Sequence, residues 1–197
     1  MKAPRQNTLR IIGGAHRGRR LAFPPDPALR PSPDRVRETL FNWLQSHIPG
    51  EDCLDLFAGS GACGIEALSR DACHVTFIDS SAPALAAIRS NLTMLGAQNF
   101  SLHQQDALRW LQAPGAGQYG VVFVDPPFAA GVLEAACQSL EDSGVLKQAA
   151  LIYLETGAGG GQPRVPANWV VLKSRQAGAV HFFLCQREAT DVEDRQA

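Results

Sequence analysis

The sequence predicts an α/β protein of the Rossmann-like class, with a mostly parallel sheet, one antiparallel strand and helices on both faces. Two observations support this prediction. From residue 52 onward, short apolar segments alternate with helical segments, which is the pattern of a parallel sheet with crossover helices. Near the C-terminus, two strand-like segments follow one another without a helix between them, so they should form a hairpin that makes one strand antiparallel.

The first residues predict a small extension before this alternating pattern. Residues 1–8 are mostly polar and are expected to be disordered. Residues 9–12 and 19–23 are strand-like and lie on either side of Gly13 and Gly14. Because glycines favour tight turns between strands, this arrangement predicts a short β-hairpin, which a proline-rich loop then follows.

A helix is expected after the proline-rich loop. Ser32 is a suitable N-cap and Pro33 suits the first helical position, where its missing N–H is not needed. Asp34 adds an acid in the first turn, which the helix dipole favours. Apolar residues then recur at helical spacing, and the helix should end before Pro49.

The remaining elements follow from the alternation itself. Gly96 should end one helix, Asp106 should cap the next, and Gly178 should lie in the link of the final hairpin. A glycine-rich loop at 157–161 is expected to be mobile. The expected strands are 53–57, 74–78, 100–103, 121–124, 151–154, 169–172 and 180–185, and the expected helices are 64–69, 83–95, 107–111 and 132–140.

Length and composition indicate a globular protein with one main domain. The chain has 197 residues, of which 45% are apolar. We expect a basic N-terminal arm or hairpin at 1–31, the main domain at 32–190 and a disordered tail at 191–197. Because the chain lacks both an apolar stretch of about 18 residues and the apolar core of a signal peptide, a cytoplasmic protein without a membrane contact is expected.

The cysteines and histidines do not form a metal-binding pattern. The five cysteines include no C-x2-C pair, and their odd number argues against a disulfide framework. We expect them to be buried small apolar side chains. The five histidines lie far apart without ligand spacing, so the sequence predicts no metal site.

The charges are divided unevenly along the chain. Residues 1–37 hold nine of the 18 Lys and Arg residues and two acids, so this segment carries +7 and the rest of the chain −8. Such an asymmetry predicts that the basic end contacts a polyanion, the alternative being a solubilising tail. Arginine suits phosphate because its planar group donates two parallel hydrogen bonds. The candidate contacts are Arg10, Arg17, Arg19, Arg20, Arg30 and Arg35.

A glycine-rich loop follows the first strand of the alternating region. Gly59, Gly61 and Gly64 have the spacing G-x-G-x-x-G, and Asp79 ends the next strand. In the context of strand, loop and helix, this pattern predicts a site for a nucleotide-like cofactor, with the acid on the ribose hydroxyls. A tight turn that needs glycine only for packing is the alternative.

Acidic residues at the strand ends indicate which cofactor is bound. Asp55, Asp79, Asp106 and Asp125 follow four successive strands. A carboxylate at Asp55 would repel a pyrophosphate but would attract an ammonium group. S-adenosylmethionine carries an ammonium and a sulfonium and has no phosphate, so this acidic rim favours it over a dinucleotide.

The segment Asp125-Pro126-Pro127-Phe128 predicts where a planar substrate binds. It follows the apolar strand 121–124, and the prolines end that strand in a stiff geometry. The result is a carboxylate, a free carbonyl oxygen and an aromatic ring at the carboxyl end of a strand, where ligands of open α/β sheets bind. A planar base with an amino group suits these parts, because the ring stacks on it and the two oxygens accept its amine hydrogens.

These motifs resemble those of class I S-adenosylmethionine-dependent methyltransferases that methylate amino groups. The N-terminal segments are similar to those of the bacterial 16S rRNA (guanine-N2)-methyltransferase family, RsmD type, and the resemblance extends from about residue 9 to residue 188. The N-terminal segments concerned are Ile11-Ile12-Gly13-Gly14, Arg17-Gly18-Arg19, Leu29-Arg30-Pro31 and Asp34-Arg35-Val36-Arg37-Glu38-Thr39-Leu40-Phe41.

The resemblance implies a seven-stranded sheet, methyl transfer to the N2 amine of a guanine in 16S rRNA, and S-adenosylhomocysteine as product. It also implies RNA bound in the small ribosomal subunit or an assembly intermediate, and we expect a monomer. The family often has Glu at the position of Asp79, but the shorter acid should still reach a ribose diol. The implied cofactor-binding residues are Asp55, Phe57, Ala58, Gly59, Ser60, Gly61, Asp79, Asp106, Ala107 and Asp125.

A mechanism without a metal follows from these residues as a hypothesis. Asp125 and the Pro126 carbonyl would accept both amine hydrogens, while Pro127 keeps the segment rigid and Phe128 stacks on the base. Orientation of this kind contributes about 7–11 kcal/mol to a reaction. Asp125 or water would take the released proton, and the base must first be flipped out of a structured RNA.

Two other functions would each explain part of this sequence. An NAD-dependent oxidoreductase would explain the glycines and Asp79, but it would not use the Asp125–Phe128 segment or the basic arm. A non-catalytic RNA-binding module would explain the basic arm, but it would not need the acids of the cofactor site.

Overall fold

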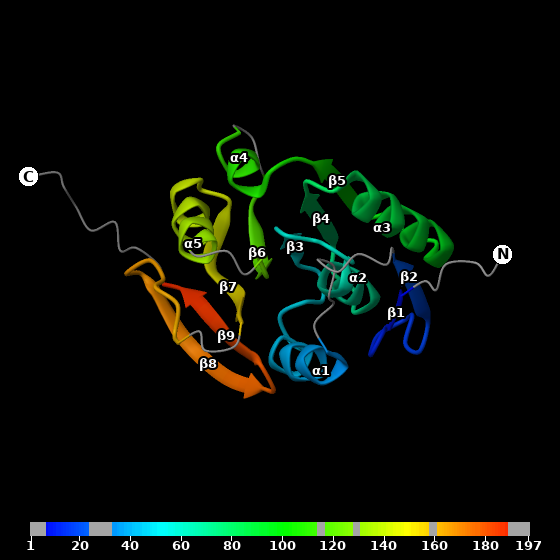
Figure 1. The fold of residues 1–197 in the computed structure, drawn as a ribbon, viewed down its shortest axis with the longest axis horizontal. Helices are drawn as coiled ribbons and strands as arrows, with labels where there is room; N and C mark the ends of the chain where they lie inside the picture. The colour runs from blue at the N-terminus through cyan, green and yellow to red at the C-terminus, as the bar shows by residue number, and fades with distance from the viewer. Residues whose placement is uncertain (1–6, 24–32, 114–116, 128–130, 158–160, 189–197) are drawn as a thin grey trace, which may run out of the picture.

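A two-stranded hairpin precedes a larger sheet of seven strands in the part of the chain that the structure describes (Figure 1). This computed structural model describes residues 7–23, 33–113, 117–127, 131–157 and 161–188. The elements are β1 (Asn7–Arg10), β2 (Arg20–Phe23), α1 (Asp34–Trp43), β3 (Asp52–Asp55), α2 (Ala62–Ser69), β4 (His74–Asp79), α3 (Ala82–Leu95), β5 (Phe100–Gln104), α4 (Ala107–Leu111), β6 (Tyr119–Val124), α5 (Val132–Asp142), β7 (Leu146–Thr156), β8 (Trp169–Ala177) and β9 (Val180–Arg187).

The large sheet confirms the predicted Rossmann-like class. Its strand order is β5-β4-β3-β6-β7-β9-β8. The first five of these strands are parallel, and β9 is antiparallel to both β7 and β8, so β9 is the one reversed strand. The strands β4 and β5 extend the sheet on one side of β3, and β6 and β7 extend it on the other, so the strand order reverses between β3 and β6. Ligands of open α/β sheets bind outside the carboxyl ends of the strands at such a point.

Helices cover both faces of the sheet, as expected. Buried side chains of α1, α2 and α3 form one apolar cluster with β1 and β2, which we call the α1-side cluster. Buried side chains of α4 and α5 form a second cluster on the other face, which we call the α5-side cluster. Side chains alternate along each strand between these two clusters, because successive residues of a strand point to opposite faces.

The N-terminal hairpin forms as predicted, and it packs on the main domain. β1 and β2 are antiparallel, with Leu9 opposite Leu21. Both side chains are buried and belong to the α1-side cluster. In Figure 1 the hairpin lies on the right, β8 and β9 lie on the lower left, and α1 lies between them at the bottom.

Several boundaries differ from the expected ones. Asn7 and Thr8 belong to β1, so the prediction of disorder is wrong for them, because they pair with β2. α1 has Pro33 as its N-cap instead of Ser32, and it ends at Trp43. β7 is longer than expected at both ends, because it also pairs with β6 at Leu146, across a register shift, and with β9 as far as Thr156.

Other expectations fall partly outside the described residues. These are Ser32 itself, the boundary between residues 31 and 32, the segment 158–160 and the tail at 191–197. Gly96 ends α3 with φ 72°, and Ser81 caps its N-terminus by accepting a hydrogen bond from the Ala84 N–H. The helix predicted from residue 83 therefore starts one residue earlier, where the side-chain cap lies.

The cysteines are buried except for one. Four of them lie in the interior, as expected for small apolar side chains, but Cys73 is exposed, and all five thiols are free. Within the described residues, no group of His, Cys, Asp and Glu has the arrangement of a metal site. None of the described helices is long and apolar enough to cross a membrane.

Candidate active site

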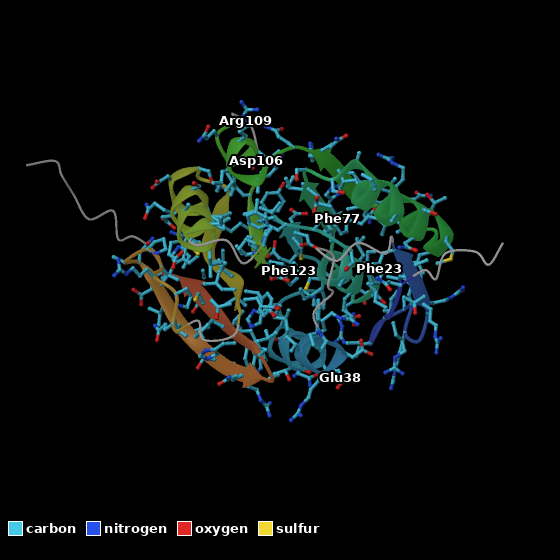
Figure 2. The ribbon with its side chains drawn as sticks, in the orientation of Figure 1. Phe23, Glu38, Phe77, Asp106, Arg109 and Phe123 are labelled. Atoms are coloured by element: carbon cyan, nitrogen blue, oxygen red, sulfur yellow. The ribbon has the colours of Figure 1, made fainter. Side chains whose placement is uncertain are left out.

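The four predicted acids lie at one edge of the sheet. Asp55 and Asp79 are the last residues of β3 and β4, and Asp125 directly follows β6. Asp106 follows β5 by two residues and precedes α4, where Figure 2 labels it. Because β5, β4, β3 and β6 are neighbours and parallel, their carboxyl ends place these acids side by side along the edge.

The glycine loop approaches the sheet closely. Gly59 and Gly61 have φ values of 51° and 75°, which residues with a side chain rarely adopt. Gly64 serves packing, since a Cβ atom there would lie 2.2 Å from the ring of Phe77 on β4. Gly61 is also closely packed, since a Cβ atom there would lie 2.8 Å from the side chain of Ile88 on α3. The loop between β3 and α2 therefore needs glycine at Gly61 for both its backbone conformation and its packing, and at Gly64 for packing against the sheet.

Asp55 is a buried carboxylate behind this loop. Its side chain accepts a hydrogen bond from the Gly64 N–H at 2.9 Å. Burial raises the pKa of Asp55 to about 7, the Gly64 N–H opposes part of this rise, and the Asp79 carboxylate adds to it. A cation next to Asp55 would favour its ionised form, so this position suits an ammonium group better than an anion.

Asp79 is held rigidly at the end of β4. Its two carboxylate oxygens accept hydrogen bonds from the backbone N–H groups of Gly59 and Ser81, each at 2.7 Å. Because each carboxylate oxygen has two lone pairs, both can still accept a hydrogen bond from a ligand. The acid therefore links the glycine loop to β4 and presents acceptors for a pair of hydroxyl groups.

Asp106 caps α4, as expected from the sequence. Its carboxylate accepts a hydrogen bond from the Arg109 N–H at 3.0 Å, and its side chain is exposed. The following residue, Ala107, is buried in the α5-side cluster. The loop residues Ala58 and Ser60 are also buried.

The proline segment ends β6 in the predicted way. Asp125 is half-buried, Pro126 is buried and Pro127 is exposed. Phe128, the predicted stacking residue, lies outside the described residues, as does Arg30. The structure therefore brings Asp125 and Pro126 to the same edge as the other predicted acids.

A fifth acid at this edge was missed by the sequence interpretation. Val124 and Leu154 are register partners in β6 and β7, so Glu155 lies next to Asp125, at the usual strand spacing of about 4.8 Å. Glu155 is buried, and its carboxylate accepts a hydrogen bond from the Tyr153 hydroxyl at 2.8 Å. The rule that identified the other acids could have found it, because the predicted strand ended at Leu154.

Four of the predicted arginines lie on the hairpin and one lies on α1. Arg10 and Arg20 are register partners on β1 and β2, which places their side chains on the same side of the hairpin. Arg10 also lies 3.6 Å from a carboxylate oxygen of Asp34, at a largely exposed position. Of these five predicted arginines, the ones that are exposed and make no ion pair within the described residues are Arg17, Arg19, Arg20 and Arg35.

Polar contacts hold the loop of the basic hairpin, between β1 and β2, against α2. Ile12 and Gly13 donate backbone hydrogen bonds to the Glu66 carboxylate, each at 2.8 Å. The buried Arg37 lies 3.7 Å from the same carboxylate and donates a hydrogen bond to the backbone oxygen of Arg10. The sequence gives no local sign of this cluster, because Ile12 and Glu66 are 54 positions apart and Arg10 and Arg37 are 27 positions apart. α2 thus connects the basic hairpin to the glycine loop.

Comparison with known proteins agrees with this arrangement. A family model described as conserved hypothetical protein 95 matches residues 9–186. The chain is 46% identical over 197 residues to ribosomal RNA small subunit methyltransferase D of Escherichia coli (strain K12), covering 98% of this chain and 99% of the relative. It is 41% identical over 182 residues to the protein of the same name from Haemophilus influenzae, covering 90% of this chain and 93% of the relative.

A solved structure is also similar. It is described as a putative methyltransferase, yhhF, from Escherichia coli, and it superposes with a TM-score of 0.84 at 46% identity. The match covers 93% of this chain and all of that chain. The similarity therefore extends over nearly the whole chain.

Proposed function

Because the chain belongs to the RsmD family of ribosomal RNA small subunit methyltransferases, we propose that it transfers a methyl group from S-adenosylmethionine to the exocyclic N2 amine of a guanine in 16S rRNA. The observation that carries the proposal is the row of acids at one sheet edge, which includes the Asp125-Pro126-Pro127 segment. Neither an NAD-dependent oxidoreductase nor a non-catalytic RNA-binding module accounts for this combination.

The glycine loop and three acids bind the cofactor in this proposal. Gly59 and Gly61 let the backbone approach it, Asp55 pairs with its ammonium group, and Asp79 accepts hydrogen bonds from its ribose hydroxyls. Asp106 and Ala107 lie where the adenine binds, and Phe57, Ala58 and Ser60 complete the loop. The cofactor supplies an electrophilic methyl group on a sulfonium.

Asp125 and Pro126 orient the nucleophile. The lone pair of the guanine N2 amine is delocalised into the purine, so the free amine is a poor nucleophile. Asp125 and the Pro126 carbonyl accept its two hydrogens, which turns the lone pair toward the methyl group, while Phe128 stacks on the base. These contacts need no metal ion, and their main contribution is proximity and orientation.

The arginines of the basic N-terminal segment hold the RNA in this proposal. Arg10, Arg17, Arg19, Arg20, Arg30 and Arg35 bind phosphates near the flipped base. The substrate is the small ribosomal subunit or an assembly intermediate in the cytoplasm, and the enzyme acts as a monomer. Methyl transfer to assembled subunits and to protein-free 16S rRNA, compared under the same conditions, tests the form of the substrate.

Asp125→Ala tests the central assignment. We expect kcat for methyl transfer to fall roughly 100-fold or more, which is the scale of the loss when a reacting group is no longer held in the productive orientation. Binding of S-adenosylhomocysteine, measured by calorimetry, should change much less. Asp142→Ala, which alters an exposed acid on α5, is the control and should keep full activity. Near-normal transfer by Asp125→Ala would contradict the role of this residue.

A further inference from the structure

β8 contains a bulge that changes the face to which its side chains point. Val171 pairs with Cys185 of β9, but the next partners along the ladder are Lys173 and Leu184, so Leu172 is an extra residue. A shift of one residue moves every following side chain to the other face of a sheet. Bulges occur next to active sites, where they redirect side chains in this way.

Burial confirms the change of face. Val171 packs against the α5-side cluster, to which its partner Cys185 also belongs. After the bulge, Lys173 and Arg175 pair with Leu184 and Phe182, whose side chains belong to the α1-side cluster. Without the bulge, Lys173 and Arg175 would lie on the same face as Val171, away from α1.

A contact between Lys173 and Trp43 supports this orientation independently. The Lys173 ammonium nitrogen lies 5.9 Å from the centre of the Trp43 ring, on α1. The same ring lies 5.3 Å from the ring of Phe182, the register partner of Arg175. Lys173 and Arg175 therefore lie on the α1 side of the sheet, beside a half-buried aromatic ring.

The redirected cations lie in line with the candidate active site. Glu155 of β7 pairs with Phe182 of β9, and Phe182 pairs with Arg175 of β8, so these residues form one row across the sheet. Asp125 continues this row beyond Glu155. At a strand spacing of about 4.8 Å, the backbone of Arg175 lies roughly 14 Å from that of Asp125.

Both cations are available to a ligand. Lys173 and Arg175 are exposed, and within the described residues neither forms an ion pair with a carboxylate. By contrast, Lys147 and Arg187 are each held by an acid. β8 is the edge strand of the sheet, so no further strand covers this side of it within the described part of the chain.

We propose that Lys173 and Arg175, with Trp43 beside them, form a second RNA-binding surface that holds the phosphodiester backbone on the side of the active site opposite the hairpin. The proposal rests on the proposed function, because the RNA strand must cross the sheet edge to bring its base to Asp125. Figure 1 shows the hairpin and β8 on opposite sides of α1, so the strand is held at two separated places. Two cations and an aromatic ring match a phosphate backbone better than an apolar protein partner.

The test compares Arg175→Gln and the double variant Lys173→Gln/Arg175→Gln with the control Arg164→Gln. Arg164 is also exposed, but its neighbour Val165 packs against the α5-side cluster, on the other face. Affinity for small subunits lacking the methyl group and for protein-free 16S rRNA is measured against salt concentration, with S-adenosylhomocysteine present. Thermal unfolding and S-adenosylhomocysteine affinity verify that each variant is folded.

For the double variant we expect the slope of log K against log salt to decrease by about 1.4, since each phosphate contact to a single strand contributes about 0.7. This corresponds to roughly 20-fold weaker binding at 0.1 M salt. KM for the RNA should rise while kcat stays close to the wild-type value. Arg175→Gln should show about half the change in slope, and Arg164→Gln should match the wild type.

Two results would overturn the proposal. One is an unchanged affinity and salt slope in the double variant. The other is weaker binding to the subunit together with unchanged binding to protein-free rRNA, which would identify a ribosomal protein as the partner. Failure of the proposed function would be seen separately, because the wild-type protein itself would then not methylate guanine in either RNA substrate.

Discussion

Replacing Asp55 with asparagine is expected to stabilise the cofactor-free protein and to weaken cofactor binding. Asp55 is buried, and its pKa in the folded protein is about 7, against an ordinary value of 3.8. The unfolded chain therefore releases this proton near pH 4, whereas the folded protein keeps it until about pH 7. Because the folded state binds the proton more tightly, stability decreases as the pH rises through this range.

The difference in pKa sets the magnitude of the effect. A shift of about three units corresponds to about 4 kcal/mol, which the wild-type protein loses in full above pH 7. Asparagine is neutral, has nearly the same shape and still offers an oxygen to the Gly64 N–H, which donates to Asp55 at 2.9 Å. Asp55→Asn should therefore be more stable than the wild type by up to about 4 kcal/mol at pH 8, and by much less near pH 4.

Urea unfolding without cofactor measures this effect. With a slope of about 2 kcal/mol per M, the midpoint should rise by roughly 2 M at pH 8. Asp142→Asn, at an exposed position on α5, should change the free energy of unfolding by less than about 0.5 kcal/mol. Equal midpoints of Asp55→Asn and wild type at pH 8, or a difference that does not shrink toward pH 4, would refute the reasoning.

The same variant should bind S-adenosylhomocysteine less tightly. A charged hydrogen bond to the ammonium group contributes on the order of 2 kcal/mol, so the Kd should rise roughly 30-fold. Gain of stability together with loss of binding would show that burial of this carboxylate serves the ligand and not the fold.

The remaining predictions concern pH and packing. In the wild type, the Kd for S-adenosylhomocysteine should rise roughly tenfold from pH 8 to pH 6, because Asp55 gains a proton, and calorimetry should find this dependence absent in Asp55→Asn. Gly14→Ala should destabilise the protein by about 3 kcal/mol or more in urea unfolding, because φ is +74° and the new Cβ would lie 1.6 Å from a backbone oxygen of α2. Gly18→Ala, where the space is open, should have a smaller effect. Hydrogen bonds from Arg187 lower the pKa of Glu141 to about 2, so the wild type should lose stability between about pH 4.5 and pH 2, and Glu141→Gln should reduce this loss in acid unfolding.

Local sequence patterns were sufficient to predict the edge at which the site lies. The prolines after Val124 end β6, and the glycines after Asp55 open the turn into α2, because both residue types act on their own backbone. The sequence alone therefore locates the acids at the carboxyl ends of β3, β4 and β6, without showing which strands are neighbours in the sheet. Parallel pairing then brings such strand ends together in any sheet of this class.

The tertiary structure alone decided how distant segments meet. The Glu66 carboxylate accepts hydrogen bonds from the backbone N–H groups of Ile12 and Gly13, which lie more than 50 positions away in the sequence. No local sequence pattern predicts such a contact. The extra residue Leu172 is recognised only from the pairing of β8 with β9, because its effect depends on the register of another strand. Residue type and spacing act through the nearby backbone and are visible in the sequence, whereas register and buried ion pairs depend on which segments the folded core brings into contact.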